Sequence, residues 1–333
     1  MSGPAELDIP LDRPGRTFGA MRLPWSHDES AYGQIVVPVI VLNGCPGPTV
    51  LAVAGVHGDE YEGQVVLGDL ARDLDPASLA GRLILVPSAN LPAAVVGRRT
   101  SPIDGGNLAR VFPGRGDGPP TSQIAEGLMR LLLPHADYVL DLHSGGRTLD
   151  YLPCAWSRLP SEAVQRKQTL DALAAFGASD AGVVLKPQSQ GTFLAAAHNA
   201  GKIAISSELG GAGALTPKTL AIARAGISRF LGYAGLVGPK PSPASVRFLS
   251  VEPKHFVRAP GRGLFEPAAT LGDTVRAGDI AGRLHDLERP DRAPEIVRFS
   301  ADGILLCRRA PAPAEMGDVL AHLGRPVEHT ELL

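Results

Sequence analysis

The segment TVLAVAGVHGDEYEGQV, residues 49–65, predicts both the class of fold and the place of the functional site. Its first half, Thr49–Val56, is a run of apolar and β-branched residues, which is typical of a strand buried on both faces in a parallel sheet. A polar cluster of His57, Asp59 and Glu60 follows, and a helix is expected after it. Because open α/β sheets bind ligands at the carboxyl ends of their strands, this cluster is a candidate site.

The pair His57 and Glu60 has a spacing that suits a metal ion. The two residues are three positions apart, so both side chains can face one ion from a tight turn or from the first turn of a helix. Gly58 lets the backbone bend closely around such an ion. An ordinary strand-to-helix loop, with a capping acid and a solvated histidine, explains the same residues equally well. The pair alone therefore leaves both interpretations open.

Strand and helix patterns alternate over residues 34–238 and predict a mostly parallel, doubly wound α/β sheet. The other expected strands are Gln34–Leu42, Arg82–Val86, Tyr138–Leu142 and Lys202–Ser206. The expected helices are Glu62–Leu74, Ser122–Leu133, Ser161–Phe176, Thr192–Asn199 and Pro217–Leu231. Pro38 cannot donate a backbone hydrogen bond, so we expect the strand that contains it towards a sheet edge.

The pattern changes on both sides of this catalytic domain. Residues 1–33 show little periodicity and are predicted to form an N-terminal arm. The segment 239–244 begins with PKPSP and is predicted to be a stiff linker. Short β segments separated by turn motifs such as LGDTVRAGDIAG follow it. Residues 245–333 are therefore predicted to form a small C-terminal β-barrel domain.

The composition argues against several classes of protein. A net charge of −2 gives no basic surface for nucleic acid or for an anionic membrane. No secretory signal is recognised and no apolar run reaches the length of a membrane span. The cysteines Cys45, Cys154 and Cys307 are odd in number and far apart, which fits a reducing compartment better than a disulfide framework. We expect a cytoplasmic protein that acts on a small molecule, and a homo-oligomer is compatible with these features.

Two further polar clusters follow predicted buried strands. His143 ends one strand in the run DLHSGG, and Glu208 follows another in SSELGGAG. A catalytic zinc ion takes three His or carboxylate ligands and keeps one position for water. The ligand set that satisfies this rule is His57, Glu60 and His143. Asp141 is predicted to orient an imidazole from behind, although a salt bridge or a helix cap is an alternative.

Glu208 is the acid that this ligand set leaves free. A free carboxylate beside a metal can take a proton from water and pass it to a leaving amine. Capping of a strand end is the plain alternative for a single acid. The apolar strand before Glu208 and the Gly-Gly pair after Leu209 favour the catalytic interpretation.

Four motifs resemble those of the succinylglutamate desuccinylase/aspartoacylase family: GVHGDEYEG, GGNLARVFPG, DLHSGG and SELGGAG. Their order and spacing, with the expected C-terminal barrel, agree with the family from Gln34 onward. The resemblance implies a zinc-carboxypeptidase-like fold with a doubly wound mixed sheet, and an amide hydrolase with one zinc ion per chain. Within the family, RTSPIDGGN, SELGGAG and LGDTVRAGD are most similar to the N-alpha-acetyl-L-2,4-diaminobutyrate deacetylases of ectoine degradation.

The resemblance also implies roles for single residues. The residues that match the family's zinc ligands are His57, Glu60 and His143. Glu208 matches the catalytic base, and Arg99 matches the arginine that polarises the scissile carbonyl. Arg110 matches the arginine that holds the substrate carboxylate, and a guanidinium suits both tasks. Asn107 is predicted to be a substrate-binding neighbour, although it is not the family's paired asparagine.

The chain departs from the family pattern at Ala109, where the family has the asparagine that precedes Arg110. Three functions are therefore weighed. The first is a zinc-dependent deacylase that hydrolyses a small N-acyl amino acid, with N-alpha-acetyl-L-2,4-diaminobutyrate as the best substrate. A carboxypeptidase-type peptidase would use the same residues. A catalytically silent metabolite-binding homologue would explain Ala109, but it would have no need of Glu208.

Overall fold

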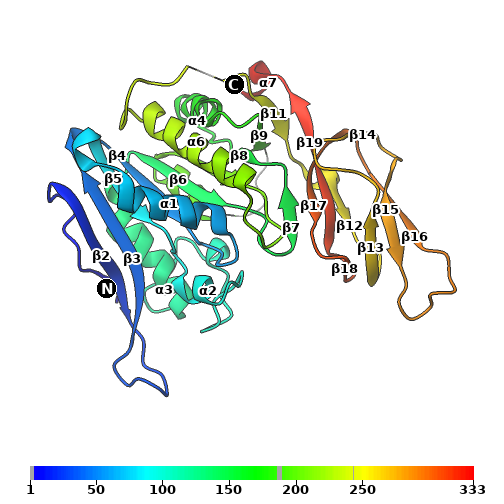
Figure 1. Ribbon diagram of the computed structural model, residues 1–333, viewed down its shortest axis with the longest axis horizontal. Helices are drawn as coiled ribbons and strands as arrows, with labels where there is room; N and C mark the ends of the chain where they lie inside the picture. The colour runs from blue at the N-terminus through cyan, green and yellow to red at the C-terminus, as the bar shows by residue number, and fades with distance from the viewer. Residues whose placement is uncertain (1–3, 186–189, 243) are drawn as a thin grey trace.

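The computed structural model describes residues 4–185, 190–242 and 244–333, and one long mixed sheet crosses this part of the chain (Figure 1). In spatial order its first strands are β1 (Glu6–Leu7), β2 (Gly15–Pro24), β3 (Gln34–Asn43), β5 (Ala80–Val86), β4 (Cys45–Ala54), β6 (Tyr138–His143) and β10 (Ile203–Glu208). The order continues with β8 (Cys154–Arg158), β9 (Asp180–Val184), β11 (Arg247–Ser250), β19 (Val319–Val327), β17 (Gly303–Arg309) and β14 (Thr274–Val275).

The centre of the sheet is parallel and its flanks are mixed, because β8, β9 and β11 pair in parallel whereas β1, β2 and β3 pair in the antiparallel sense. β5, β4, β6 and β10 pair in parallel with one another. β3 and β8 join this group in the antiparallel sense, one on each side. The predicted mixed α/β sheet is thereby confirmed.

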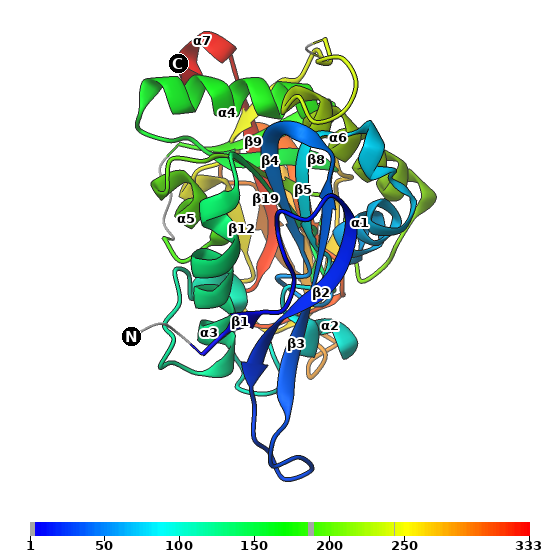
Figure 2. The same ribbon diagram turned by 90° about the vertical axis from the view of Figure 1, so that its left-hand side faces the viewer.

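Helices cover both faces of the sheet, as the alternating pattern predicts. Figure 2 shows α3 (Pro120–Gly127) and α5 (Phe193–Asn199) on one side and α1 (Tyr61–Asp73) and α6 (Pro217–Tyr233) on the other. α4 (Ala163–Phe176) shares an apolar core with α1 and α6, and α3 and α5 share a second core. Both cores contact β4, so residues 50–54 have no exposed surface. This burial explains the continuous apolar run in the sequence.

The described part of the segment that we predict as an arm, residues 4–33, contains two strands, β1 and β2. β2 pairs with β3 along its whole length, from Gly15 opposite Asn43 to Pro24 opposite Gln34. The buried side chains of β2 are Ala20, Met21 and Leu23, and its other residues are partly or fully exposed. This spacing is too irregular to give the alternation by which a half-buried strand is recognised.

Pro38 lies inside the sheet rather than on an edge strand, because β3 is placed between β2 and β5. However, β5 pairs with β3 only over Ile40–Asn43, so Pro38 has a neighbouring strand on one side alone. Ala20, directly opposite on β2, directs its N–H and its C=O towards Asp8 on the other side. The position of the missing N–H of Pro38 therefore faces the side on which β3 has no neighbouring strand, and the sheet loses no backbone hydrogen bond there.

The C-terminal region has its own apolar core and lies at one end of the molecule (Figure 1). Its second sheet consists of β16 (Glu295–Arg298), β15 (Ile280–His285), β13 (Gly263–Pro267) and β18 (Pro313–Ala314), in that order. β12 (Phe256–Arg258) pairs with β19. Two strand pairings among the described residues join this region to the preceding part of the chain: β11 pairs with β9, and β7 (Leu149–Tyr151) pairs with β17. A closed barrel over residues 245–333 stays a prediction.

Candidate active site

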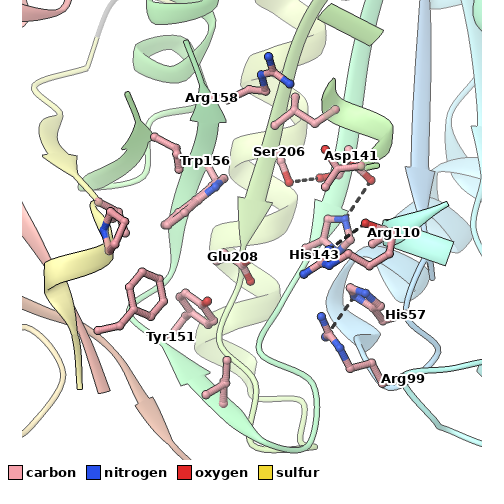
Figure 3. A pocket seen from close by; sticks show the side chains of 18 of the residues that line it. His57, Arg99, Arg110, Asp141, His143, Tyr151, Trp156, Arg158, Ser206 and Glu208 are labelled. Carbon is pink, nitrogen blue, oxygen red and sulfur yellow. Dashed lines mark hydrogen bonds and ion pairs between the residues drawn. The ribbon is translucent and has the colours of Figure 1, made fainter. Parts of the chain in front are cut away.

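The predicted site residues gather at the carboxyl ends of three neighbouring strands. β4 leads to His57, β6 ends on His143, and β10 ends on Glu208. β6 lies between β4 and β10, and His143 is paired in register with Glu208. Figure 3 shows His57, His143 and Glu208 around one cavity. The parallel order of these strands is what brings distant parts of the sequence together.

His57, Glu60 and His143 form a compact, buried donor set. Glu60 Oε1 lies 2.6 Å from His57 Nδ1, and Glu60 Oε2 lies 2.7 Å from His143 Nδ1. One ligand atom from each residue can be chosen so that all three lie within 4.8 Å of one another. Glu60 precedes the first turn of α1, which directs its carboxylate back towards the strand ends. Two imidazoles and one carboxylate are ligands that zinc accepts.

The far nitrogens of both imidazoles have partners of their own. His57 Nε2 lies 3.2 Å from Asn107 Oδ1, and His143 Nε2 lies 3.2 Å from Asp141 Oδ1. An oxygen acceptor at Nε2 favours a proton there, which leaves Nδ1 of each ring free to bind a metal. In the structure both rings turn Nδ1 towards Glu60. The side chains of His57, Glu60 and His143 therefore fit a metal ion.

The electrostatics of the set agree with this fit. Burial raises the pKa of Glu60, but the imidazoles of His57 and His143 lower it by a larger amount. The pKa of Glu60 is therefore below its ordinary value, and the carboxylate is ionised. Burial lowers the pKa of His57 and keeps its imidazole neutral. Burial also lowers the pKa of His143, but Asp141 and Glu60 raise it well above its ordinary value. A metal ion would have to displace that proton, so its affinity would depend on pH.

Asp59, the third member of the first polar cluster, has a different role. Its side chain is buried and accepts a hydrogen bond from the backbone N–H of Arg147 at 2.9 Å. Asp59 thus ties the turn after β4 to the loop after β6, and it lies outside the compact donor set.

Glu208 has the properties of a group that can accept and release a proton. Its Oε2 is buried and has no hydrogen-bond partner among the described residues. Burial, and next the charge of Glu60, raise its pKa well above the ordinary value of a carboxyl group. A carboxylate without a fixed partner, facing a cavity beside a metal donor set, can exchange protons with bound water or substrate.

Arg99 and Arg110 line the same cavity on the side of His57 and His143 (Figure 3). Arg99 Nη1 lies 3.3 Å from Glu60 Oε1. Much of Arg110 is exposed to solvent, and its Nη1 donates to the carbonyl of the neighbouring Ala109 at 2.8 Å. No carboxylate among the described residues forms an ion pair with Arg110. Burial lowers its pKa, and the charge of Arg99 adds to this effect.

Asn107 lies behind the donor set, and it is not among the described residues that line the cavity. Its Oδ1 faces His57 and also accepts from the backbone N–H of Ala109 at 3.0 Å. A role in substrate binding stays a prediction for Asn107. Ala109 is buried but does reach the cavity wall.

The cavity holds about 450 Å³ and extends beyond the predicted residues. The lining residues that the sequence did not single out include Tyr151, Trp156, Arg158, Glu252 and Phe256. Tyr151 lies on β7 and Trp156 on β8, two short strands that the sequence pattern did not reveal. Glu252 and Phe256 follow the Pro-rich linker. The site is therefore shared between the central sheet and the C-terminal region.

A His–Glu–His donor set beside a free, buried carboxylate is typical of metal-dependent hydrolases. Residues 46–234 match the succinylglutamate desuccinylase/aspartoacylase catalytic domain, which is more than half of the chain. The chain belongs to this family, and the predicted resemblance is confirmed.

Relatives match almost the whole chain. The N-alpha-acetyl-L-2,4-diaminobutyric acid deacetylase of Halomonas elongata is 41% identical over 328 residues, which cover 98% of this chain and 96% of that protein. The product-bound structure of the ectoine utilization protein EutE (DoeB) from Ruegeria pomeroyi superposes with a TM-score of 0.94 at 38% identity, over 98% of this chain and 100% of that one. A succinylglutamate desuccinylase/aspartoacylase from Rhodobacter sphaeroides gives a TM-score of 0.93 at 35% identity, with the same coverage. In the described part of the chain, none of the helices combines the length and the apolar character needed to cross a membrane.

Proposed function

We propose that this protein is a zinc-dependent deacylase that hydrolyses N-alpha-acetyl-L-2,4-diaminobutyrate to diaminobutyrate and acetate. The observation that carries the proposal is the free carboxylate of Glu208 beside the His57–Glu60–His143 donor set in one cavity. The activity named for the Halomonas relative supports the choice of substrate. One zinc ion per chain would be held by the donor set.

The zinc ion, when bound, would polarise the amide carbonyl and make water more acidic. The remaining work falls to side chains of this chain. Glu208 takes the proton from the attacking water and delivers it to the nitrogen of the leaving amine. Arg99 donates to the carbonyl oxygen as negative charge develops there, and Arg110 holds the substrate carboxylate with its free donors.

The arrangement of charge explains why these roles fall to different residues. Glu60 is already contacted by two imidazoles and by Arg99, so it has little capacity to accept a further proton. Glu208 has a buried oxygen without a partner and a raised pKa, so it can both accept and release one. Because Ala109 stands where the family has an asparagine, one amide donor beside Arg110 is absent. The carboxyl groups of Glu60 and Glu208 are not affected by this difference.

A substrate panel on zinc-loaded protein tests the proposal. We expect release of acetate from N-alpha-acetyl-L-2,4-diaminobutyrate, slower turnover of N-succinyl amino acids, and no cleavage of peptides with a free carboxyl end. Faster cleavage of peptides would instead identify a carboxypeptidase. Tight binding of the acetylated substrate without turnover would identify a silent binding protein, and either result would reject the proposed function.

A further inference from the structure

One wall of the cavity has no role in the deacylation chemistry. It is formed by Tyr151 and Trp156 from the central sheet and by Glu252 and Phe256 from the C-terminal region. Figure 3 shows Tyr151 and Trp156 on the side of Glu208 that is opposite to His57 and Arg99. A substrate whose amide lies near Glu208 would therefore direct its other end towards this wall.

The aromatic part of the wall is built around the imidazole of His322. The ring centroid of His322 lies 4.8 Å from that of Phe256, 5.2 Å from that of Tyr151 and 6.2 Å from that of Trp156. His322 Nε2 also lies 3.1 Å from the hydroxyl of Tyr151. The four rings come from β12, β19, β7 and β8, so neighbouring strands fix each of them. Such a wall is in place before a ligand arrives.

The four rings are uncharged near pH 7, and the exposed guanidinium of Arg258 lies 5.9 Å from the centroid of Phe256. His322 is 1% exposed, and burial lowers its pKa to about 3, so its imidazole is neutral near pH 7. The faces of indole and phenyl rings attract cations, most strongly where water is excluded. A neutral imidazole behind the rings does not oppose this attraction.

Glu252 supplies the negative charge of this wall. Its backbone is fixed, because its N–H donates to His255 Nδ1 at 3.0 Å and its C=O accepts from the N–H of His255 at 2.9 Å. Its carboxylate is one-third exposed, and its ion pair with Lys254 is long, at 3.6 Å, and lies at the surface. Of the other acids that line the cavity, Asp141 contacts His143 and Glu208 is the proposed base.

Two of the cavity's arginines lie away from this wall, and the third, Arg158, shares a face of β8 with Trp156 but has a hydrogen-bond partner of its own. Arg99 and Arg110 lie on the opposite side of Glu208, near the metal donors, and Arg158 lies at the far end from Arg99 (Figure 3). Arg158 donates through Nη1 to Gln190 at 3.1 Å. A substrate that carries both a carboxylate and an ammonium group can therefore find a separate partner for each.

We propose that Glu252, Trp156 and Phe256 form a subsite for the ammonium group of a short cationic side chain on the substrate. The subsite rests on the proposed deacylase function, and it assigns the selectivity of that reaction to the wall shared with the C-terminal region. The carboxylate of Glu252 pairs with the ammonium group, and the rings of Trp156 and Phe256, which line the cavity, contact the methylene groups of the side chain.

The test compares two substrates that differ in charge and hardly in shape. N-alpha-acetyl-L-2,4-diaminobutyrate ends in an ammonium group where N-acetyl-L-norvaline ends in a methyl group. We expect zinc-loaded enzyme to prefer the cationic substrate in kcat/KM. Glu252→Gln should reduce the ratio of the two kcat/KM values about tenfold, because the ammonium group loses its ion pair and keeps only a hydrogen bond to a neutral amide oxygen. Phe256→Leu should reduce the ratio about two- to tenfold through loss of the aromatic ring at this wall.

Two control variants keep the test specific. Glu295→Gln makes the same charge change on β16, outside the cavity lining, and should not alter the ratio. Glu252→Asp keeps the charge and should recover part of the lost preference. An unchanged ratio in both Glu252→Gln and Phe256→Leu would overturn the subsite. A change in preference for acyl chain length, with the ratio intact, would place the acyl group at this wall and would also overturn it.

A binding measurement separates this subsite from the proposed function. If the wild-type enzyme hydrolyses neither substrate, the deacylase function fails, but calorimetry can still compare binding of 2,4-diaminobutyrate and norvaline to the zinc-loaded protein. The subsite predicts tighter binding of diaminobutyrate and about a tenfold loss of that difference in Glu252→Gln. Equal affinities in the wild-type protein would reject the subsite independently of any activity.

Discussion

At the scale of single residues, three acids of the site are given different properties by their neighbours. Glu60 contacts two imidazoles, which hold its pKa low. The Oε2 atom of Glu208 is buried near the charge of Glu60, and the pKa of Glu208 is raised. Asp141 lies beside His143 Nε2 and holds that ring in place. Residue type alone could not distinguish a ligand, a base and a positioning group among them.

Replacement of Glu208 tests its assignment as the acid–base group. Glu208→Gln keeps the shape of the side chain but cannot accept a proton, so we expect kcat to fall on the order of 10²–10⁴-fold. The zinc content should remain at one ion per chain, because Glu208 does not belong to the donor set. Steady-state kinetics and metal analysis on the same preparation check both points. A loss of less than about tenfold would show that another group is the base.

Asn107 offers a prediction that separates two roles for one residue. If its Oδ1 positions His57, Asn107→Ala should weaken zinc affinity about 10- to 100-fold, which is typical of residues that hydrogen-bond a metal ligand. Asn107→Asp keeps an acceptor oxygen and should retain more of the affinity. Competition with a zinc chelator measures this. If zinc affinity is unchanged and KM alone rises, Asn107 binds substrate, as the sequence analysis predicts.

At the scale of elements, the turn between β4 and α1 depends on a close approach of two backbone segments. A Cβ atom on Gly58 would lie 2.1 Å from the carbonyl carbon of Ala93 and 2.3 Å from the nitrogen of Ala94. Backbone atoms cannot move aside as the end of a flexible side chain can. The N–H of Gly58 also donates to the carbonyl of Arg98 at 2.9 Å, which ties the loop that carries Arg99 to the metal site.

A pair of glycine substitutions tests this contact. Gly58→Ala should lower the stability of the fold and displace the metal donors, so both the midpoint of unfolding and zinc affinity should decrease. Gly68→Ala is the matched control, because Gly68 lies inside α1 and a Cβ there meets no atom within 4 Å. Alanine at that position should stabilise the helix by about 0.5–1 kcal/mol. Urea unfolding measures the stability of both variants. If the turn after β4 could move to make room for a Cβ atom, Gly58→Ala would not be less stable than Gly68→Ala.

The strands differ in how well the sequence pattern could predict them. β4, β6 and β10 each contain an apolar stretch and lead into a polar cluster, so their existence and the gathering of His57, His143 and Glu208 were predictable. β7, β8 and β9 are short and carry no such pattern. Trp156 and Arg158 lie on β8, so the wall of the cavity that they form could only be found from the three-dimensional structure.

At the scale of the whole molecule, the C-terminal region completes the cavity. Glu252 and Phe256 reach the cavity because β11 pairs with β9 and β12 pairs with β19. The sequence identified a change of pattern near residue 239 but not this pairing, since strand order between distant segments is a property of the folded sheet. The C-terminal region therefore takes part in the site.

Two buried histidines predict that the whole fold loses stability in acid. His198 is held neutral by burial, with a pKa of about 4, and its Nε2 lies 2.8 Å from the carbonyl of Ala204. His322 has a pKa of about 3. Both values lie below the ordinary pKa of histidine, about 6.5. Between that value and the lowered ones the unfolded chain binds protons that the native state does not, so stability falls as the pH falls.

Each such histidine should remove about 1.4 kcal/mol of unfolding free energy per pH unit once the pH is below about 6. Urea unfolding at pH 6 and at pH 5 measures the loss. His198→Asn should be less stable at both pH values but should show a smaller loss between them, because one of the two groups is gone. An equal loss in the wild-type protein and in the variant would show that His198 takes up its proton in the native state.

A zinc titration of the metal-depleted protein, followed by the rate of diaminobutyrate release from N-alpha-acetyl-L-2,4-diaminobutyrate, bears most directly on the proposed function. We expect activity to rise in proportion to added zinc and to level off at one ion per chain, while His143→Ala gains neither bound zinc nor activity. Full activity in the metal-depleted protein, or a full equivalent of tightly bound zinc in His143→Ala, would contradict the assignment of this site and its chemistry.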